Sequence, residues 1–244
     1  MIHYVLTRSA YPAAYPLEAN RRRLELTRHI TARSLAAQTE RRWRWVVTID
    51  LADPLLEQRM DVLRAAGVPL ITVPVKQRRV VREVTPDGQL EGDVEPRAGG
   101  PYRRAIEPEA GDERILTTRL DDDDALAIDA LARIRAAAER DPGEHAWIMP
   151  HGFRWHRARV CPMTHTRNMF ASLDSPRHPL QVVVEAKHNV IDEHWPVRFV
   201  DREPGWLWVR HADARSGSRR AEDPLTPRVA ARFDVDWAYL EGVR

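Results

Sequence analysis

Short apolar stretches alternate with amphipathic stretches in the first part of the chain. Ile2–Thr7, Trp45–Ile49 and Val68–Val73 are rich in β-branched and aromatic residues, which favours strands. Between them, Asn20–Gln38 and Pro54–Ala66 place apolar residues at helical spacing, and the first residue of the former is a suitable N-cap. Strands separated by helices in this way predict a parallel sheet with right-handed crossovers.

The pattern is then interrupted and resumes. Residues 83–113 are rich in proline, glycine and charge and poor in apolar residues, which predicts a flexible insertion. Ile115–Leu120 predicts the next strand, and apolar residues at helical spacing predict a helix over Asp124–Arg140. We therefore expect residues 1–140 to be one half of an α/β domain whose mostly parallel central sheet is flanked by helices.

The second half, residues 141–244, has shorter and less regular elements. The stretch 212–228 is rich in glycine, serine, proline and charge, which predicts a loop. Four strands and a final short helix are predicted at Ala146–Met149, Arg159–Met163, Val182–Glu185, Trp206–Arg210 and Val229–Leu240. We expect this smaller part to pack on the first half, so that residues 1–244 form a single domain.

Composition narrows the function classes. The 244 residues carry a net charge of +2, with 43% hydrophobic and 30% charged residues, as in an ordinary globular protein. So small a net charge gives no argument for nucleic acid as a partner. Cys161 is the one cysteine of the sequence, which excludes an intramolecular disulfide and a cysteine metal cluster.

The sequence also bears on the membrane. No stretch approaches 18 uninterrupted apolar residues, so we expect no transmembrane segment, although peripheral membrane contact is compatible with the sequence. Met1–Arg8 lacks the basic and apolar regions of a signal peptide and predicts a strand. A cytoplasmic location is the expectation that follows.

Four consecutive acids, Asp121–Asp124, follow the strand Ile115–Leu120. Adjacent carboxylates repel one another, so a fold that gathers them supplies positive charge nearby. One explanation is helix capping, which suits Asp123 and Asp124 because aspartate in a first turn accepts backbone N–H groups and interacts well with the helix dipole. The other is a divalent metal together with the phosphates that it carries.

The position of the acids favours the metal. They begin where the strand ends, and open α/β sheets bind ligands at the carboxyl ends of their strands. In an extended segment Asp121 and Asp123 point to one side while Asp122 points elsewhere. Mn²⁺ or Mg²⁺ accepts carboxylate oxygens and completes its shell with water and a diphosphate. We expect a metal–diphosphate site at Asp121 and Asp123, with Asp124 directed to the helix start.

Several motifs of the chain match known proteins. Strand–Arg119-Leu-Asp-Asp-Asp-Asp124–helix resembles the Asp-x-Asp region of glycosyltransferases with the GT-A fold. Ser34-Leu-Ala-Ala-Gln-Thr39, before the strand that ends at Asp50, resembles their opening motif. Thr7-Arg8 and Trp206–His211 are more specifically similar to the putative rhamnosyl transferases of bacteria. The resemblance implies a GT-A-like (Rossmann-like) fold and a metal-dependent enzyme that moves a sugar from a nucleotide-diphosphate donor, with rhamnose in the family's name. It makes residues 1–140 the nucleotide-sugar-binding half and residues 141–244 the smaller, acceptor-side half.

The resemblance assigns roles to individual residues. Asp123 matches the acid that binds the metal, and Asp121 matches the acid that contacts the nucleotide ribose or the metal's shell. His211 matches a late histidine that completes the metal shell in some relatives. Arg119 is placed to pair with a phosphate or with Asp50. The positions that match the nucleotide pocket are Thr7, Arg8 and Asp50.

Transfer with inversion also needs a group that takes the acceptor's proton, whereas retention does not. The candidate carboxylates are Asp192, Glu193 and Glu185. The first two are preferred, because they lie beyond a predicted strand and before Trp195-Pro196. Phe153 and Trp155 are either stacking partners for an acceptor sugar or core residues. A saccharide, a lipid-linked molecule or a small molecule is the expected acceptor.

Two other functions stay open. A nucleotidyltransferase acting on a sugar phosphate also combines an α/β sheet with Mg²⁺, but it usually needs a Gly-rich phosphate loop, and none follows Thr7. A non-enzymatic polyanion-binding module would use the arginines, which far outnumber Lys76 and Lys187. The nearly balanced charge and the clustered acids argue against the second alternative.

Overall fold

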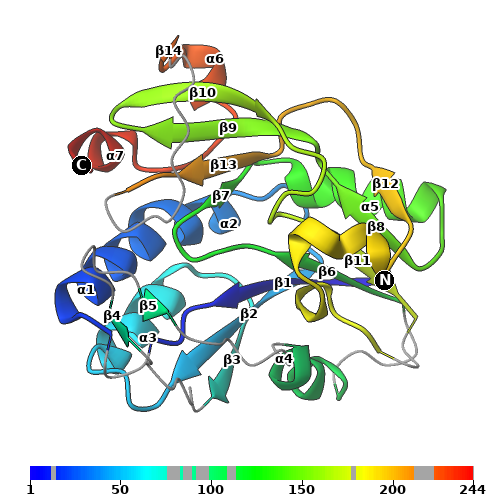
Figure 1. Ribbon diagram of the computed structural model, residues 1–244, viewed down its shortest axis with the longest axis horizontal. Helices are drawn as coiled ribbons and strands as arrows, with labels where there is room; N and C mark the ends of the chain where they lie inside the picture. Colours follow the sequence, from blue (N-terminus) through cyan, green and yellow to red (C-terminus); the bar gives the residue numbers. More distant parts are fainter. Residues whose placement is uncertain are drawn as a thin grey trace.

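The computed structural model describes residues 1–11, 15–75, 83–84, 90–91, 99–108, 114–176, 180–211 and 223–243 (Figure 1). Most of the predicted insertion and most of the predicted loop 212–228 lie outside the described residues. No described helix is long and apolar enough to cross a membrane. Two large sheets and the helices around them make up the described chain.

The main sheet has the strand order β12-β8-β11-β6-β1-β2-β3. Its strands are β1 (Ile2–Arg8), β2 (Trp43–Asp50), β3 (Leu70–Val75), β6 (Ile115–Arg119), β8 (His145–Ile148), β11 (Ser172–Ser175) and β12 (Val197–Phe199). β1 pairs in parallel with β2 and β6, and β2 pairs in parallel with β3, which confirms the predicted βαβ pattern. β11 runs antiparallel to β6 and β8. The predicted α/β class is therefore confirmed, with the parallel part at β6-β1-β2-β3.

A helical rod connects β1 to β2. It consists of α1 (Leu17–Leu26), the π-helix η1 (Thr27–Thr31) and α2 (Ala32–Ala36). The rod begins three residues before the predicted N-cap Asn20, whose side chain lies in a buried polar network instead. α3 (Leu56–Ala65) connects β2 to β3, where the sequence pattern predicts it.

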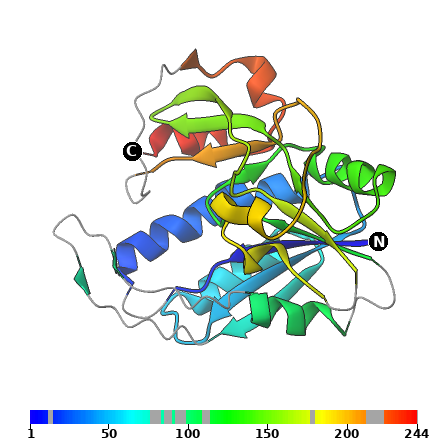
Figure 2. The same cartoon turned by 45° about the vertical axis from the view of Figure 1, so that its right-hand side comes forward.

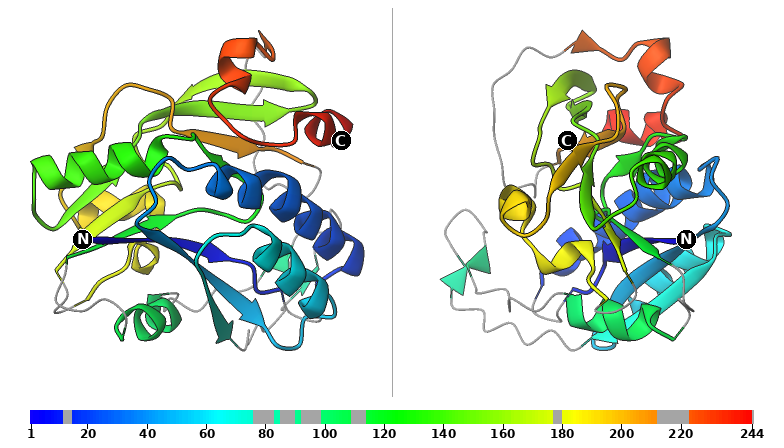
Figure 3. Two further views of the ribbon diagram at one scale, coloured as in Figure 1. Left: turned by 180° about the vertical axis from the view of Figure 1, so that it is seen from behind. Right: turned by 90° about the vertical axis from the view of Figure 1, so that its right-hand side faces the viewer.

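Alternation of side chains along β1 and β2 divides the core of the main sheet into two layers. Val5 and Val47 belong to the layer that also holds the apolar residues of the rod. Leu6 and Val46, one residue away in each strand, belong to the layer that holds α4 (Gly99–Ile106). Seen from behind, the rod lies across the near face of the main sheet (Figure 3).

The second sheet has the strand order β14-β10-β9-β13-β7. Its strands are β7 (Ala125–Leu126), β9 (His151–His156), β10 (Arg159–Thr164), β13 (Trp206–Val209) and β14 (Asp223–Pro224). It lies above the main sheet, with the helical rod between the two (Figure 2). The strands β8, β10 and β13 correspond to three of the four strands predicted in the second half of the chain.

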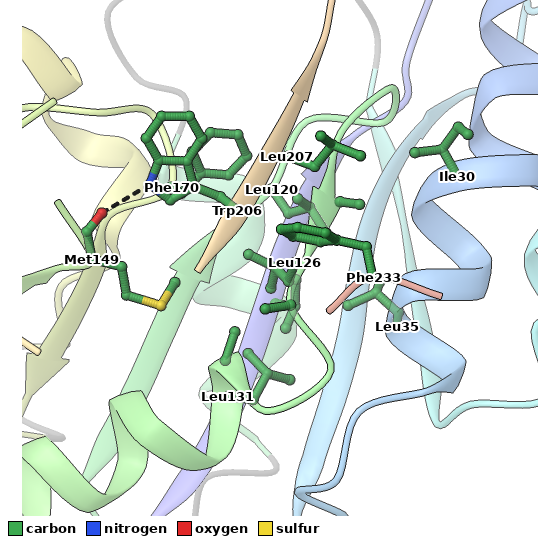
Figure 4. Packing of buried hydrophobic residues seen from close by; sticks show 14 of the residues in the cluster. Ile30, Leu35, Leu120, Leu126, Leu131, Met149, Phe170, Trp206, Leu207 and Phe233 are labelled. Atoms are coloured by element: carbon green, nitrogen blue, oxygen red, sulfur yellow. Dashed lines mark hydrogen bonds between the residues drawn. The ribbon is translucent and has the colours of Figure 1, made fainter. Parts of the chain in front are cut away.

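One apolar core joins the second sheet to the rod. Leu35 of α2 and Leu126 of β7 both belong to it, together with the β13 residues Trp206 and Leu207 (Figure 4). Trp206 stacks on Phe170 with the ring centroids 5.0 Å apart, and its indole N–H donates to the Met149 carbonyl over 2.8 Å. These contacts fix the strand that leads to His211.

The helix predicted from Asp124 is wrong at its start. α5 (Ala130–Arg140) begins six residues later, because residues 125–126 pair with β13 as strand β7. Val182–Glu185 is not a strand either. Its β-branched side chains are buried beside β6 in the 3-10 turn η2 (Val183–Glu185), where the Val183 N–H donates to the Thr117 hydroxyl.

Three other expectations need adjustment. Part of the insertion forms α4, which its glycines and proline concealed. Two short helices, α6 (Pro227–Ala230) and α7 (Trp237–Gly242), replace the single helix predicted near the end. Trp155 is a core residue with 1% of its surface exposed, so its ring is not displayed for a sugar, whereas Phe153 is only partly buried, packs edge-on against Phe233 and lines a pocket.

Candidate functional site

The acidic stretch lies at the carboxyl edge of the parallel strands, as predicted. The Leu120 N–H donates to the Leu6 carbonyl and extends the β6–β1 ladder to the first acid. Beyond it the chain turns from the main sheet into β7 of the second sheet. The segment between β6 and β7, which carries the four acids, therefore lies where the two sheets and the helical rod meet (Figure 1).

Asp122 is the most completely bonded of the four acids. Its carboxylate accepts from the Ser9 hydroxyl at 2.9 Å, the Tyr11 hydroxyl at 2.7 Å and the Arg23 guanidinium at 2.9 Å. Only 1% of the residue's surface is exposed. Burial raises the pKa of its carboxyl, and Arg23 opposes that shift. Asp122 therefore ties β1 and α1 to the acidic turn.

Asp123 shares Arg23 and adds a histidine. Its Oδ2 lies 2.8 Å from Arg23 Nη1 and 2.9 Å from His211 Nε2. Burial alone would raise the pKa of this carboxyl, but Arg23 and His211 outweigh burial and hold the pKa below its usual value. The carboxylate only accepts, so the Nε2 of His211 carries the hydrogen of this contact. We call Ser9, Tyr11, Arg23, Asp122, Asp123 and His211 the inner cluster.

Asp124 does not cap a helix, which corrects its predicted role. Its Oδ1 accepts the backbone N–H of Val209 in β13 at 2.9 Å. Burial raises the pKa of its carboxyl well above the usual value, and the neighbouring charges of Asp123 and Asp121 raise it further. Capping also fails for Asp122 and Asp123, because the helix begins only at Ala130. The acidic stretch is thus a junction between sheets.

Asp121 belongs to a different group of residues. It lies 3.3 Å from Arg119, so Arg119 pairs with this acid and not with a carboxylate of β2. Asp121 is the main cause of a raised Arg119 pKa. The expectation that Asp121 and Asp123 share a direction is therefore not met, since Asp123 turns with Asp122 to Arg23.

A second set of charges surrounds Asp121. Burial raises the pKa of Tyr102 to about 12, and the charges of Arg8, Arg119 and Asp121 all act on its hydroxyl. The same two charges of Arg119 and Asp121 act on His188, whose pKa is lowered first by burial and then by Arg119. We call Arg8, Tyr102, Arg119, Asp121 and His188 the outer cluster. Tyr102 and His188 were not predicted, because only the fold brings α4 and the segment after η2 to this edge.

One face of the helical rod holds the backbone of the acidic stretch. The hydroxyls of Thr27 and Thr31, one above the other on the rod, donate to the carbonyls of Asp122 and Asp124, each over 2.9 Å. Farther along this face, Ser34 accepts the Leu126 N–H. All three side chains are fully buried.

Gln38 completes this face. Its amide donates to the Ala127 carbonyl at 2.8 Å, and its side-chain oxygen accepts the Leu131 N–H at 3.2 Å. The motif Ser34–Thr39 therefore positions the chain that leaves the acids, and it does so without a charge. We call Thr27, Thr31, Ser34 and Gln38 the polar face.

The residues predicted to line a nucleotide pocket differ in what they present. The Thr7 hydroxyl is fully buried and accepts from the Trp45 indole at 2.9 Å, so its side chain offers no surface to a nucleotide. Arg8 is exposed at the end of β1. Asp50 is 5% exposed, and one of its carboxylate oxygens accepts the Ala52 N–H at 2.9 Å.

The predicted bases lie on the surface near arginines. Asp192 contacts Arg167 at 2.6 Å, and Glu185 contacts Arg103 at 3.0 Å. Glu193 is exposed. The structure therefore holds two of these acids in ion pairs, whereas His188, in the same segment, lies close enough to feel the charges of the outer cluster.

The predicted metal ligands are brought together only in part. Within the described ranges, no group of three or more histidine, cysteine, aspartate or glutamate side chains is placed to hold a metal ion. Asp121 is therefore not grouped with Asp123 and His211. Asp123 and His211 fit a smaller role, because one carboxylate and one imidazole meet at 2.9 Å. Such a pair suits an ion whose shell is completed by water and substrate phosphates.

A cleft of about 430 Å³ adjoins the inner cluster. His211 forms part of its wall, together with Arg22 and Leu26 of α1 and Tyr239 of α7. Arg22 gives the cleft a positive charge, and Leu26 and Tyr239 give it apolar surface, next to the Asp123–His211 pair. A ligand with an anionic group and an apolar part matches this lining.

Comparison with known proteins identifies the family. Residues 102–223, which are half of the chain, match the family model described as Putative rhamnosyl transferase. A search of curated proteins finds no match. The matched stretch includes the whole acidic sequence, the outer-cluster residues Tyr102 and His188, and the segment that ends in His211.

One solved structure supports the fold, and weaker likenesses accompany it. S. aureus TarS has a TM-score of 0.52 and 12% sequence identity over 86% of this chain and 37% of the TarS chain. TarS 1-349 from S. aureus has a TM-score of 0.49 and 11% identity, with 86% and 60% covered. The inositol-1-phosphate CTP transferase from T. maritima reaches a TM-score of 0.44 at 9% identity, with 100% and 98% covered. The chain thus spans less than two thirds of both TarS chains, and the first likeness supports the fold alone.

Proposed function

This chain belongs to the putative rhamnosyl transferase family, and from that premise we propose that it is a divalent-metal-dependent glycosyltransferase. It moves a hexose from a nucleoside-diphosphate donor to a hydroxyl of a saccharide, a lipid-linked molecule or a small molecule. The observation that carries the proposal is the contact of Asp123 with His211 at the carboxyl edge of the parallel strands. There a cleft with basic and apolar walls adjoins the pair.

Different residues would bind the metal, the phosphates and the ribose of the donor. Asp123 and His211 would hold Mn²⁺ or Mg²⁺, which supplies Lewis-acid stabilisation of the leaving diphosphate when bound. To ligate through Nε2, His211 moves its hydrogen to Nδ1 or loses it, since Nε2 now donates to Asp123. The outer cluster offers Arg8 and Arg119 to the phosphates, and Asp121 to the ribose hydroxyls.

For inverting transfer, His188 is our candidate base in addition to Asp192, Glu193 and Glu185. The charges of Arg119 and Asp121 act on its imidazole, which supports a position near the proposed donor site, and burial and Arg119 lower its pKa, which favours a neutral imidazole at pH 7. We expect His188→Gln to lower kcat at least about 100-fold with little change in KM. Asp192→Asn, measured in parallel, should lower kcat far less. The reverse ranking would assign the base to Asp192.

A thermal-shift panel tests metal-dependent donor binding. UDP, GDP and dTDP are added with and without Mn²⁺, and binding at about 100 Kd stabilises the fold by about 2.7 kcal/mol, or roughly 5–10 °C for a chain of this size. We expect that shift only when metal and the preferred diphosphate are both present. Stabilisation by diphosphate that is equal without metal would contradict metal dependence.

Asp123→Asn removes the negative charge but keeps the shape of the side chain. We expect it to abolish the Mn²⁺-dependent shift and sugar transfer. Asp141→Asn is the matched control, because Asp141 is 53% exposed and far along the chain from the acids. Normal transfer by Asp123→Asn would rule out the proposed site. Incorporation of a nucleotide into a sugar phosphate, with release of pyrophosphate, would instead indicate the nucleotidyltransferase.

A further inference from the structure

Arg23 is the cation that the inner cluster already holds. We propose that Arg23 is the resident counter-ion of Asp123, and that it leaves this carboxylate for the donor diphosphate when a divalent ion binds there. The inference rests on the proposed metal-dependent transfer. It assigns to Arg23 two successive partners, an acid before donor binding and a phosphate after it.

The bonding of Arg23 is incomplete. A single nitrogen, Nη1, contacts both Asp122 at 2.9 Å and Asp123 at 2.8 Å. The Nε of Arg23 is buried and has no hydrogen-bond partner among the described residues. The side chain keeps 21% of its surface exposed. A guanidinium with five N–H donors thus uses one nitrogen here and retains donors for a phosphate.

Each of the two acids keeps a hydrogen-bond donor when Arg23 moves away. Asp122 keeps its hydrogen bonds from Ser9 and Tyr11. Asp123 keeps its contact with His211 and is 10% exposed on its side chain. Because each carboxylate retains a donor, the cluster has a second stable arrangement without the guanidinium. A structural ion pair sealed in the core has no such alternative.

Arg23 and a divalent ion compete for the same atom. Arg23 and His211 both contact Oδ2 of Asp123. An ion bound between Asp123 and His211 would stand beside the guanidinium, and two positive charges at one buried carboxylate repel strongly. Binding of the ion therefore favours movement of Arg23. The cleft is lined by Arg22, the sequence neighbour of Arg23, and by His211, which contacts Asp123, so a diphosphate bound in the cleft would lie next to this carboxylate.

Binding of Mn²⁺ measured by electron paramagnetic resonance tests the exchange directly. The free ion gives a strong signal that bound ion loses, so no activity is needed. Without nucleotide, we expect Arg23→Gln to bind Mn²⁺ about tenfold more tightly than the wild type, because the competing charge is gone. Arg23→Lys keeps the charge and should stay close to the wild type.

The second arm measures the diphosphate. With Mn²⁺ saturating, UDP, GDP and dTDP are titrated, and Arg23→Gln should bind the preferred one about tenfold more weakly than the wild type. Arg21→Gln is the matched control, since Arg21 lies on the same helix, is 54% exposed and pairs with Glu18. This control should match the wild type in both arms.

The outcomes separate this inference from the proposed function. If the wild type binds Mn²⁺ with a nucleoside diphosphate but Arg23→Gln binds Mn²⁺ no more tightly, the function stands and the exchange is wrong. If neither protein binds Mn²⁺ with any diphosphate, metal-dependent transfer fails and the exchange falls with it. Tighter Mn²⁺ binding together with weaker diphosphate binding in Arg23→Gln supports the exchange.

Discussion

Two arginine–aspartate pairs lie beside the Tyr11 ring, and they differ in how completely their hydrogen-bonding groups are paired. The guanidinium of Arg59 lies 5.1 Å from the ring centre and that of Arg23 lies 5.7 Å from it. Both side chains of the Arg59–Asp53 pair are fully buried, whereas Arg23 and Asp123 keep 21% and 10% of their side-chain surface exposed. The first pair is fully buried, and the second is partly exposed.

Hydrogen bonding separates the pairs further. Each nitrogen of Arg59 has its own partner: Nε donates to Asp53, Nη1 donates to Ser9 and Nη2 donates to Asn20. Arg23 divides one nitrogen between two acids. A buried ion pair resists exchange when every nitrogen of the guanidinium is hydrogen-bonded, because any movement leaves a charge without compensation. Arg59 therefore serves the fold, while the loosely bonded Arg23 is suited to change partners.

The largest effect should come from the sealed pair. Arg59→Met leaves Asp53 buried without its cation, and we expect it to lower the free energy of unfolding by about 3–5 kcal/mol. Arg23→Met should lower it by about 1 kcal/mol or less, because both of its acids keep other donors. Urea denaturation of the two variants gives both numbers. Equal losses would remove the distinction between the pairs.

The second-largest loss of stability should come from the polar face, which holds the backbone around the acids. Gln38→Leu removes the hydrogen bonds to the Ala127 carbonyl and the Leu131 N–H, and we expect a loss of about 2–3 kcal/mol on unfolding. Because the polar face also positions the acidic turn, Mn²⁺ binding in the presence of diphosphate should weaken as well. Gln58→Leu, at an exposed position of α3, is the control and should change stability by less than about 0.5 kcal/mol. Unchanged Mn²⁺ binding in a destabilised Gln38→Leu would limit the polar face to folding.

The sequence predicts the strands and the linear motifs of the site better than it predicts the charge pairs. Hydrophobic periodicity locates β1, β2, β3 and β6, and parallel strands that end together place the acids at one edge. The resemblance marks Ser34–Thr39 and His211; in the structure His211 contacts Asp123, and Ser34 accepts the N–H of Leu126, two residues after the acidic stretch. These features depend on local pattern or on a linear motif, so they can be read along the chain.

The partners of the acids cannot be predicted in this way. Asp122 meets Arg23 across 99 residues and Ser9 across 113 residues. Arg21, Arg22 and Arg23 are identical in type and adjacent, and only the packing of α1 on the acidic turn decides which of them is buried. The two-residue strand β7 is likewise too short for periodicity, so the helix was predicted to begin at the acids. Contacts between distant segments, which set charge pairing, are not encoded in local spacing.

His3 is a buried base that contacts a hydroxyl where Arg59 contacts an acid, and it should make the stability of the fold depend on pH. His3 is fully buried, contacts the Thr118 hydroxyl at 2.7 Å, and has its pKa lowered to about 3, first by burial and then by Arg135. The unfolded chain accepts a proton near pH 6.5, and the folded chain does not. Stability is therefore complete above pH 6.5 and is lost as the pH falls from about 6.5 toward 3.

Between pH 7 and pH 5 the lowered pKa of His3 should reduce the free energy of unfolding by about 2 kcal/mol. We expect urea denaturation of the wild type to show that loss and His3→Leu to show a flatter pH dependence, whatever its absolute stability. His165→Gln, at an exposed position, should keep the wild-type slope. A wild-type slope retained in His3→Leu would mean that other groups govern acid unfolding.

The smallest effect belongs to an arginine–aspartate pair that is open on both sides. Arg33 on α2 contacts Asp234 at 3.0 Å, with 50% and 49% of the two side chains exposed. Water and salt screen such a pair, and holding two mobile side chains costs entropy, so Asp234→Asn should change the free energy of unfolding by less than about 0.5 kcal/mol. Any loss should shrink further in 0.5 M NaCl. If Asp234→Asn instead cost as much as Arg59→Met, burial and saturation would not be what separates the sealed pair from the open one, and the exchange assigned to Arg23 would lose its physical basis.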